Sequence, residues 1–255
     1  MGHALIQGLL AKGMPARQLY AADPSPQARR KISRLGLSVS DDNRECRQAD
    51  VIVLAVKPQE MPSVLADLAS NLHPPQWVIS IAAGIPLSFL ESRLPRLPIV
   101  RVMPNLPATV GQGFSALAMG CRVRLRHRRI AMEIFNAVGQ VVRVAEPLLD
   151  AITAVSGSGP AYVFFLAQVW EEAALRLGLP RAVARRAVAQ TLKGSVQLLE
   201  KNSLSPQEWI ARVASKRGTT EAALRVLEQR RVRFAIVAAL QAAAKRSRQL
   251  SRLSQ

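Results

Sequence analysis

The sequence has few aromatic, cysteine and histidine residues, which excludes several classes of protein. Aromatic side chains make up 4% of the 255 residues, so the hydrophobic core must consist mainly of Ala, Val, Leu and Ile. The two cysteines, Cys46 and Cys121, have neither CxxC nor metal-ligand spacing, and the three histidines stand apart. We therefore expect no disulfide scaffold and no metal site. Two unpaired thiols are typical of a reducing compartment and favour a cytoplasmic location.

Acidic residues are also scarce, at 17 Asp and Glu against 35 Lys and Arg, which leaves a formal net charge of +18. Such a basic chain could bind nucleic acid. However, the densest basic cluster, at residues 122–129, contains no Phe, Tyr or Trp on which bases could stack. We therefore do not expect specific nucleic-acid binding, and we interpret the arginines as a solvated surface that attracts small anions.

Long hydrophobic runs are absent, because no stretch of about 18 consecutive apolar residues occurs. We therefore expect no membrane-spanning helix. The first residues, Met1 to Ile6, carry no basic leader of the kind that precedes a secretory signal.

Two halves of the chain differ in their hydrophobic pattern. In residues 1–148, short β-rich runs alternate with helical stretches, which predicts an α/β domain with a parallel sheet. We expect strands at residues 18–22, 51–56, 77–81, 99–103 and 141–144, and helices at 2–12, 26–35, 58–71 and 86–94. Residues 149–255 have only helical periodicity, with helices expected at 161–177, 181–201, 206–215, 221–229 and 232–253. Broad Ala- and Leu-rich faces on these helices predict that the second domain buries them against another copy of the chain.

The opening segment has the pattern of a Rossmann βαβ unit entered in its middle. A helix begins at Gly2 and leads into a strand, but no strand and no Gly-x-Gly precede it. We therefore expect that the first strand is missing from the chain as given, either through a mis-set start site or through a real truncation. Asp23 ends the next strand, where a carboxylate would bind the ribose of NAD, while Arg29 and Arg30 favour the phosphate of NADP. Alternatively, Asp23 and Ser25 are turn and helix-cap residues.

Small residues stand at three further strand ends, where open α/β sheets bind ligands. They are Ala55-Val56-Lys57-Pro58, Ser80-Ile81-Ala82-Ala83-Gly84 and the loop at Asn105, whose amide could bind a carboxamide or a ribose. Two helix starts in the second half, 156–162 and 215–221, are either plain caps or sites for a carboxylate ligand.

Together these segments resemble the pyrroline-5-carboxylate reductase family. The resemblance covers essentially the whole chain and is carried by Met1-Gly2, 55–59, 80–84, Arg101-Val102-Met103-Pro104-Asn105, 154–162 and Gly218-Thr219-Thr220-Glu221. It implies an N-terminal Rossmann-like domain, an all-α C-terminal dimerisation domain, homodimers or larger homo-oligomers, and reduction of 1-pyrroline-5-carboxylate to L-proline by NADPH, with NADH possible.

The resemblance also implies roles for individual residues. The cofactor would lie along Gly2, Ala55, Val56, Lys57, Pro58, Ala82, Ala83 and Asn105, with Asp23 and Asp42 near its adenosine end. Ser215, Thr219 and Thr220 would bind the substrate carboxylate, and Thr220, the catalytic residue, would reach the imine nitrogen. One departure from the family concerns this loop: Lys216-Arg217 stands where the family usually has Pro-Gly. A glycine there can require a positive φ that arginine tolerates poorly.

Overall fold

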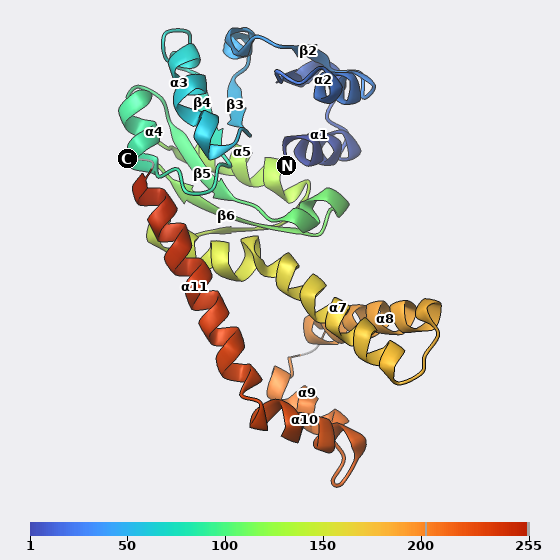
Figure 1. Cartoon of the computed structure of the whole chain (residues 1–255). Helices are drawn as coiled ribbons and strands as arrows, with labels where there is room; N and C mark the ends of the chain where they lie inside the picture. Colours follow the sequence, from blue (N-terminus) through green and yellow to red (C-terminus); the bar gives the residue numbers. More distant parts are fainter. Residues whose placement is uncertain (202, 254–255) are drawn as a thin grey trace. The chain divides into compact units, whose positions relative to one another are not determined.

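The computed structural model describes the backbone of residues 1–201 and 203–253 (Figure 1). Contacts divide the chain into two compact units. The first unit contains Met1–Pro160 and the described part of 242–255, and the second contains Ala161–Gln241. The C-terminal helix, α11 (Val232–Leu253), therefore contributes to both units.

The first unit is built on a five-stranded sheet with the order β3-β4-β5-β6-β7. Its strands are β3 (Val51–Leu54), β4 (Trp77–Ser80), β5 (Ile99–Met103), β6 (Gly113–Met119) and β7 (Gly139–Arg143). Every neighbouring pair is parallel except β5 and β6, which are antiparallel. Two more strands, β1 (Tyr20–Ala22) and β2 (Ser38–Ser40), form a separate parallel pair. The Rossmann-like α/β architecture predicted for the first half is confirmed.

Helices cover both faces of the larger sheet. Successive side chains of a strand point to opposite faces, so each strand contributes residues to the core on both sides. On β4, Val78 packs into the cluster that contains α3 (Met61–Ala69) and α4 (Leu87–Arg93), while Ile79 packs into the opposite cluster with α1 (Gly2–Ala11) and α5 (Leu125–Asn136). All four residues of β4 are buried, as expected of a strand that is covered on both faces. The sheet is therefore a rigid layer, and its strand ends are fixed positions.

The other helices of the chain follow their local sequence signals. In α2 (Pro26–Ser33), the Ser25 hydroxyl accepts from the Ala28 N–H and proline occupies the first turn. The remaining helices are α6 (Leu149–Ile152), α7 (Gly159–Arg176), α8 (Arg181–Lys201), α9 (Pro206–Val213) and α10 (Thr219–Gln229). Short 3-10 helices occupy Ala16–Gln18, Asn43–Gln48 (η2), Pro58–Glu60, Leu106–Val110 (η4) and Glu146–Leu148, and a π-helical turn occupies Thr153–Gly157.

Most predicted elements are present, and the exceptions have physical causes. The strand expected from residue 18 begins only at Tyr20, because residues 16–18 form a 3-10 turn. Strand β6 was missed because its sequence, GFSALAM, is rich in small residues, and its pairing with β5 supplies what strand propensity does not. Helix α5 was missed because its first turn is basic, which opposes the helix dipole.

The second unit exposes much apolar surface within one chain. On α7, Phe164, Phe165 and Trp170 are 60%, 64% and 44% exposed. One stretch of the described residues, 146–176, is apolar and long enough to cross a membrane by length and composition alone. A single stretch of this kind is weak evidence for a membrane helix, because apolar helix faces at protein–protein interfaces can pass the same test.

Candidate active site

Three of the predicted cofactor-binding segments meet at one edge of the sheet. Strands β3, β4 and β5 are parallel neighbours, so their carboxyl ends lie side by side. The segment 55–58 follows β3, the segment 81–84 follows β4, and Asn105 comes two residues after the end of β5. Ligands of open α/β sheets bind at this edge. The structure thus brings together residues that are up to 50 positions apart in the sequence.

The amino end of helix α1 lies at the same edge. A Cβ added to Gly2 would stand 3.2 Å from the Cβ of Ala55, tighter than an ordinary contact. The first helical hydrogen bond of α1 runs from Leu5 N–H to Met1 O, and no side chain among the described residues caps the helix. The preceding N–H groups and the positive end of the helix dipole are therefore available to an anionic group near β3.

The residues along this edge differ in how far their side chains are exposed to solvent. Ala55, Lys57 and Ala83 are exposed, whereas Ala82 is only 4% exposed and packs into the core. Any contact of Ala82 with a ligand would therefore involve its backbone. Gly84 has a φ of +78°, a conformation that favours glycine, and it turns the chain away from the sheet after β4.

Asn105 is held by two hydrogen bonds on opposite ends of its amide. Its Oδ1 accepts from the Phe114 backbone N–H at 2.9 Å, and its Nδ2 donates to Ser156 Oγ at 3.0 Å. Phe114 lies on β6, and Ser156 lies in the π-helical turn. The sequence marked 156–162 only as a helix start, so this contact was not foreseen. The run Ser-Gly-Ser-Gly-Pro was the signal that could have indicated a close approach of backbone elements.

The cap interpretation of Asp23 and Ser25 is realised in the structure. Asp23 Oδ1 accepts from the Ser25 backbone N–H at 2.8 Å, and Ser25 caps α2. Arg29 donates to the carbonyl oxygens of Asp23 and Pro24 at 2.8 and 2.9 Å. The Arg29 guanidinium therefore binds the loop backbone and also pairs with Asp41 at 3.5 Å, and Arg30 is the exposed cation of the pair.

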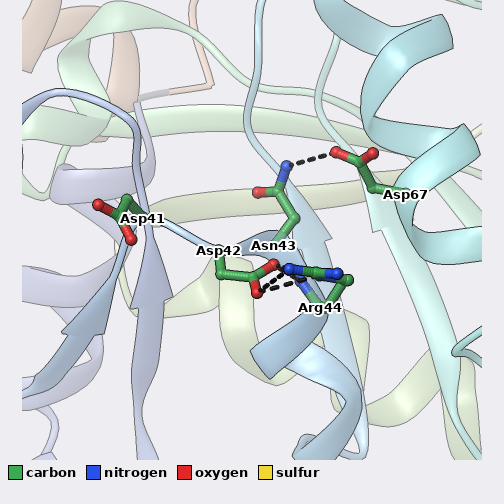
Figure 2. A pocket seen from close by; sticks show the side chains of 5 residues that line it. All are labelled: Asp41, Asp42, Asn43, Arg44 and Asp67. Atoms are coloured by element: carbon green, nitrogen blue, oxygen red, sulfur yellow. Dashed lines mark hydrogen bonds and ion pairs between the residues drawn. The ribbon is translucent and has the colours of Figure 1, made fainter.

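Asp42 lies in the loop after β2 and lines a shallow, open pocket of about 440 Å³ (Figure 2). Its Oδ1 accepts from the Arg44 N–H and from Arg44 Nε, both at 2.9 Å, which places Asp42 as the cap of η2. The Arg44 guanidinium, through these hydrogen bonds, lowers the pKa of Asp42. Asp41 and Asp67 are further carboxylates of the lining, and the Asn43 amide donates to Asp67. Asp41 pairs with Arg29 at 3.5 Å and Asp42 with Arg44 at 2.8 Å, so two of the three carboxylates lie beside a cation.

Ser215, Thr219 and Thr220 belong to the second unit. Helix α10 starts at Thr219, and its first helical hydrogen bond runs from Ala222 N–H to Gly218 O. The three backbone N–H groups of residues 219–221 come before this bond. A Cβ on Gly218 would lie 2.3 Å from Ser215 Oγ, so only glycine allows the serine hydroxyl to lie this close to the helix start. Hydroxyls and backbone N–H groups are thus gathered at one helix end, a combination that suits a carboxylate.

Arg217, just before this helix, adopts a φ of +60°. The departure from Pro-Gly therefore puts an arginine in the left-handed region, as the sequence suggested. Its N–H donates to the Glu221 carboxylate, which stabilises the turn. Among the described residues, no cluster of three or more His, Cys, Asp or Glu side chains could hold a metal ion.

Comparisons with known proteins show the family of this chain. Residues 146–250 match the family model for pyrroline-5-carboxylate reductase dimerisation, and residues 1–84 match a model described as NADP oxidoreductase, coenzyme F420-dependent. A pyrroline-5-carboxylate reductase from Pseudomonas aeruginosa is 43% identical over 256 residues, which cover 98% of this chain and 93% of the relative. The chain belongs to the pyrroline-5-carboxylate reductase family.

Solved structures of the pyrroline-5-carboxylate reductase family share the whole fold. The enzyme from Coxiella burnetii matches with a TM-score of 0.91 at 34% identity, over 98% of this chain and 94% of that chain. A Plasmodium falciparum pyrroline carboxylate reductase with NADP bound matches with a TM-score of 0.90 at 31% identity, over the same shares of the two chains. The match includes both the sheet and the helical half.

Proposed function

We propose that this protein reduces 1-pyrroline-5-carboxylate to L-proline with NADPH as the hydride donor, the last step of proline biosynthesis. The observation that supports it best is the convergence of Gly2, Ala55, Ala83 and Asn105 at one edge of the parallel sheet. A helix start without a side-chain cap and strand ends with small side chains fit a dinucleotide that lies close to the backbone. NADPH is the proposed cofactor, with NADH as an alternative hydride donor.

The reaction asks little acid–base chemistry of the protein. A protonated cyclic imine already accepts hydride readily, and NADPH, when bound, supplies that hydride. The protein must hold C4 of the nicotinamide about 3–3.5 Å from the imine carbon of the substrate and exclude water. Hydride transfer to such an imine needs no paired carboxylates and no metal.

We assign separate residues to substrate binding, catalysis and cofactor binding. The N–H groups at the start of α10, with Ser215 and Thr219, bind the substrate carboxylate, and Lys216 adds attraction for an anion. The Thr220 hydroxyl is the catalytic group, because it can orient the imine nitrogen or transfer a proton to it. Asn105 binds the nicotinamide-ribose end of the cofactor, and Asp23 and Asp42 lie near its adenosine end.

The functional unit is a homodimer or a larger homo-oligomer formed by the helical half. The exposed apolar side chains of α7 are explained if a second copy covers them, since clustered exposed apolar side chains often mark protein–protein interfaces. We propose 1–148 as the cofactor domain and 149–255 as the dimerisation and substrate domain, and a cytoplasmic location. Cys46 and Cys121 are both free thiols, which suits that compartment.

The experiment is to mix the purified chain with NADPH and 1-pyrroline-5-carboxylate, and to follow NADPH absorbance and proline formation. A matched control substrate is 1-pyrroline, which lacks the carboxylate and should react far more slowly. Failure to bind NADPH, combined with a stable oligomer, would instead support a catalytically impaired remnant. Faster turnover of cyclic imines without a carboxylate would support a related imine reductase.

A further inference from the structure

The contact between Asn105 and Ser156 joins two elements of the first unit that are distant in sequence. Asn105 lies in the loop between β5 and η4, and Ser156 lies 51 residues later in the π-helical turn. Both side chains are half-buried, so solvent competes only partly for their hydrogen bond. The bond therefore restricts an amide that otherwise rotates about its side-chain torsions.

The hydrogen-bond partners fix the orientation of the amide. The Phe114 N–H can only donate, so the atom that faces it must be Oδ1, and Nδ2 must face Ser156. The Ser156 hydroxyl oxygen then accepts from the amide. One Nδ2 hydrogen and one Oδ1 lone pair of Asn105 stay outside these two bonds.

The backbone around Ser156 is packed closely enough to hold this geometry. A Cβ on Gly157 would stand 2.5 Å from the Cε of Met103, the last residue of β5. The turn is closed by a bond from Ser158 N–H to Thr153 O at 2.8 Å, the i→i+5 pattern of a π-helix. Single π turns often occur at functional sites. The side-chain methyl of Met103, at the end of β5, thus packs directly against the backbone of the turn next to Ser156.

We propose that Ser156 is a positioning residue for cofactor binding. Its hydroxyl holds the Asn105 amide in one orientation, so that the amide presents one fixed donor and one fixed acceptor to the nicotinamide-ribose end of NADPH. This inference rests on the proposed role of Asn105 in cofactor binding. Without the hydroxyl, the amide keeps only the Phe114 contact and must be ordered when the cofactor binds.

The test compares Ser156→Ala, Ser156→Thr and Ser158→Ala in the full-length protein. Ser158 is the matched control, because it is also half-buried in the same segment and its hydroxyl has no hydrogen bond among the described residues. The dissociation constant of NADPH is measured by fluorescence titration, and KM and kcat are measured separately. Loss of one neutral hydrogen bond predicts that Ser156→Ala weakens NADPH binding about fivefold. We expect a smaller change in kcat, restoration in Ser156→Thr, and no change in Ser158→Ala.

A double-mutant cycle with Asn105→Ala separates positioning from a direct contact. If Ser156 acts through Asn105, then Ser156→Ala has no further effect on NADPH binding in the Asn105→Ala background. Equal losses in both backgrounds, or equal losses in Ser156→Ala and Ser158→Ala, would overturn the inference. Should Asn105→Ala not fold, the comparison of the three serine variants decides by itself. If the unaltered chain does not bind NADPH, the proposed function fails; if it binds and Ser156→Ala binds equally well, only this inference fails.

Discussion

The guanidinium of Arg101 lies 2.8 Å from Glu146 Oε1, and the same oxygen accepts from the Leu87 backbone N–H at 2.7 Å. The Arg101 side chain is 8% exposed and the Glu146 side chain 30% exposed. Arg101 is on β5, Leu87 begins α4, and Glu146 precedes α6, so one carboxylate joins three elements of the first unit. The Glu146 carboxylate therefore neutralises the buried Arg101 cation and accepts a hydrogen bond from the N–H at the start of α4.

Removing this carboxylate should destabilise the fold. Glu146→Ala leaves the Arg101 charge buried without its counter-ion, and we expect a loss of about 2–4 kcal/mol in the free energy of unfolding, because Glu146 is partly exposed. Urea unfolding of the two proteins measures this loss in the free energy of unfolding. The control is Glu133→Ala, since the Glu133–Arg129 pair is exposed on both sides and should contribute under about 0.5 kcal/mol. Similar losses in both variants would contradict this account.

The catalytic role of Thr220 predicts a defect in turnover. Thr220→Ala removes the hydroxyl proposed to orient or protonate the imine nitrogen, and kcat should fall by about a hundredfold, the lower range for general acid catalysis. Thr220→Ser keeps the hydroxyl and should retain most activity. Steady-state kinetics at saturating NADPH makes the comparison. Unchanged turnover in Thr220→Ala would show that another group contacts the nitrogen.

The left-handed conformation of Arg217 predicts that glycine is better tolerated there. Strain at a positive φ costs about 1–2 kcal/mol for a residue with a Cβ, and the added freedom of glycine in the unfolded chain offsets part of the gain. Arg217→Gly should therefore stabilise the protein by about 0.5–1 kcal/mol, as measured by urea unfolding. Lys216→Gly is the control: Lys216 has no positive φ to relieve, so this change should be neutral or destabilising. A loss of stability in Arg217→Gly would indicate that the Arg217 side chain matters more than its strain.

His127 should make the protein less stable in mild acid. Burial lowers the pKa of His127, and the charges of Arg126 and Arg124 lower it further. The unfolded chain takes up a proton below about pH 6.5, whereas the folded chain does so only at lower pH. Stability is therefore full above about pH 6.5 and falls as the pH drops below it, by at most about 1.4 kcal/mol per pH unit from this one group.

The measurement is urea unfolding at pH 7.5 and 5.5 for the unaltered protein, His127→Gln and His73→Gln. His127→Gln cannot titrate and should show a weaker dependence on pH than the unaltered protein. His73 is exposed, so His73→Gln should keep the full dependence. An identical pH slope in all three proteins would mean that His127 does not contribute to it.

Local sequence patterns by themselves determined much of the secondary structure. Strand β5 and helices α8 and α11 have the bounds that their patterns predict, because strand and helix periodicity are local properties. The alternation of strands with helices also determined that the carboxyl ends of β3, β4 and β5 share one edge. The positions of Ala55, Ala83 and Asn105 at that edge could therefore be predicted without knowing any long-range contact.

Only the tertiary structure decided the pairings between distant residues. The Ser247 hydroxyl lies 2.6 Å from Asp150 Oδ1, 97 positions away, and Ser156 binds Asn105. Strand β6 likewise forms because β5 and β7 pair with it on its two sides, and not because its own residues favour extended structure. Hydrogen bonds between residues far apart in the sequence depend on how the packed layers bring their backbones together. Local sequence periodicity does not contain that information.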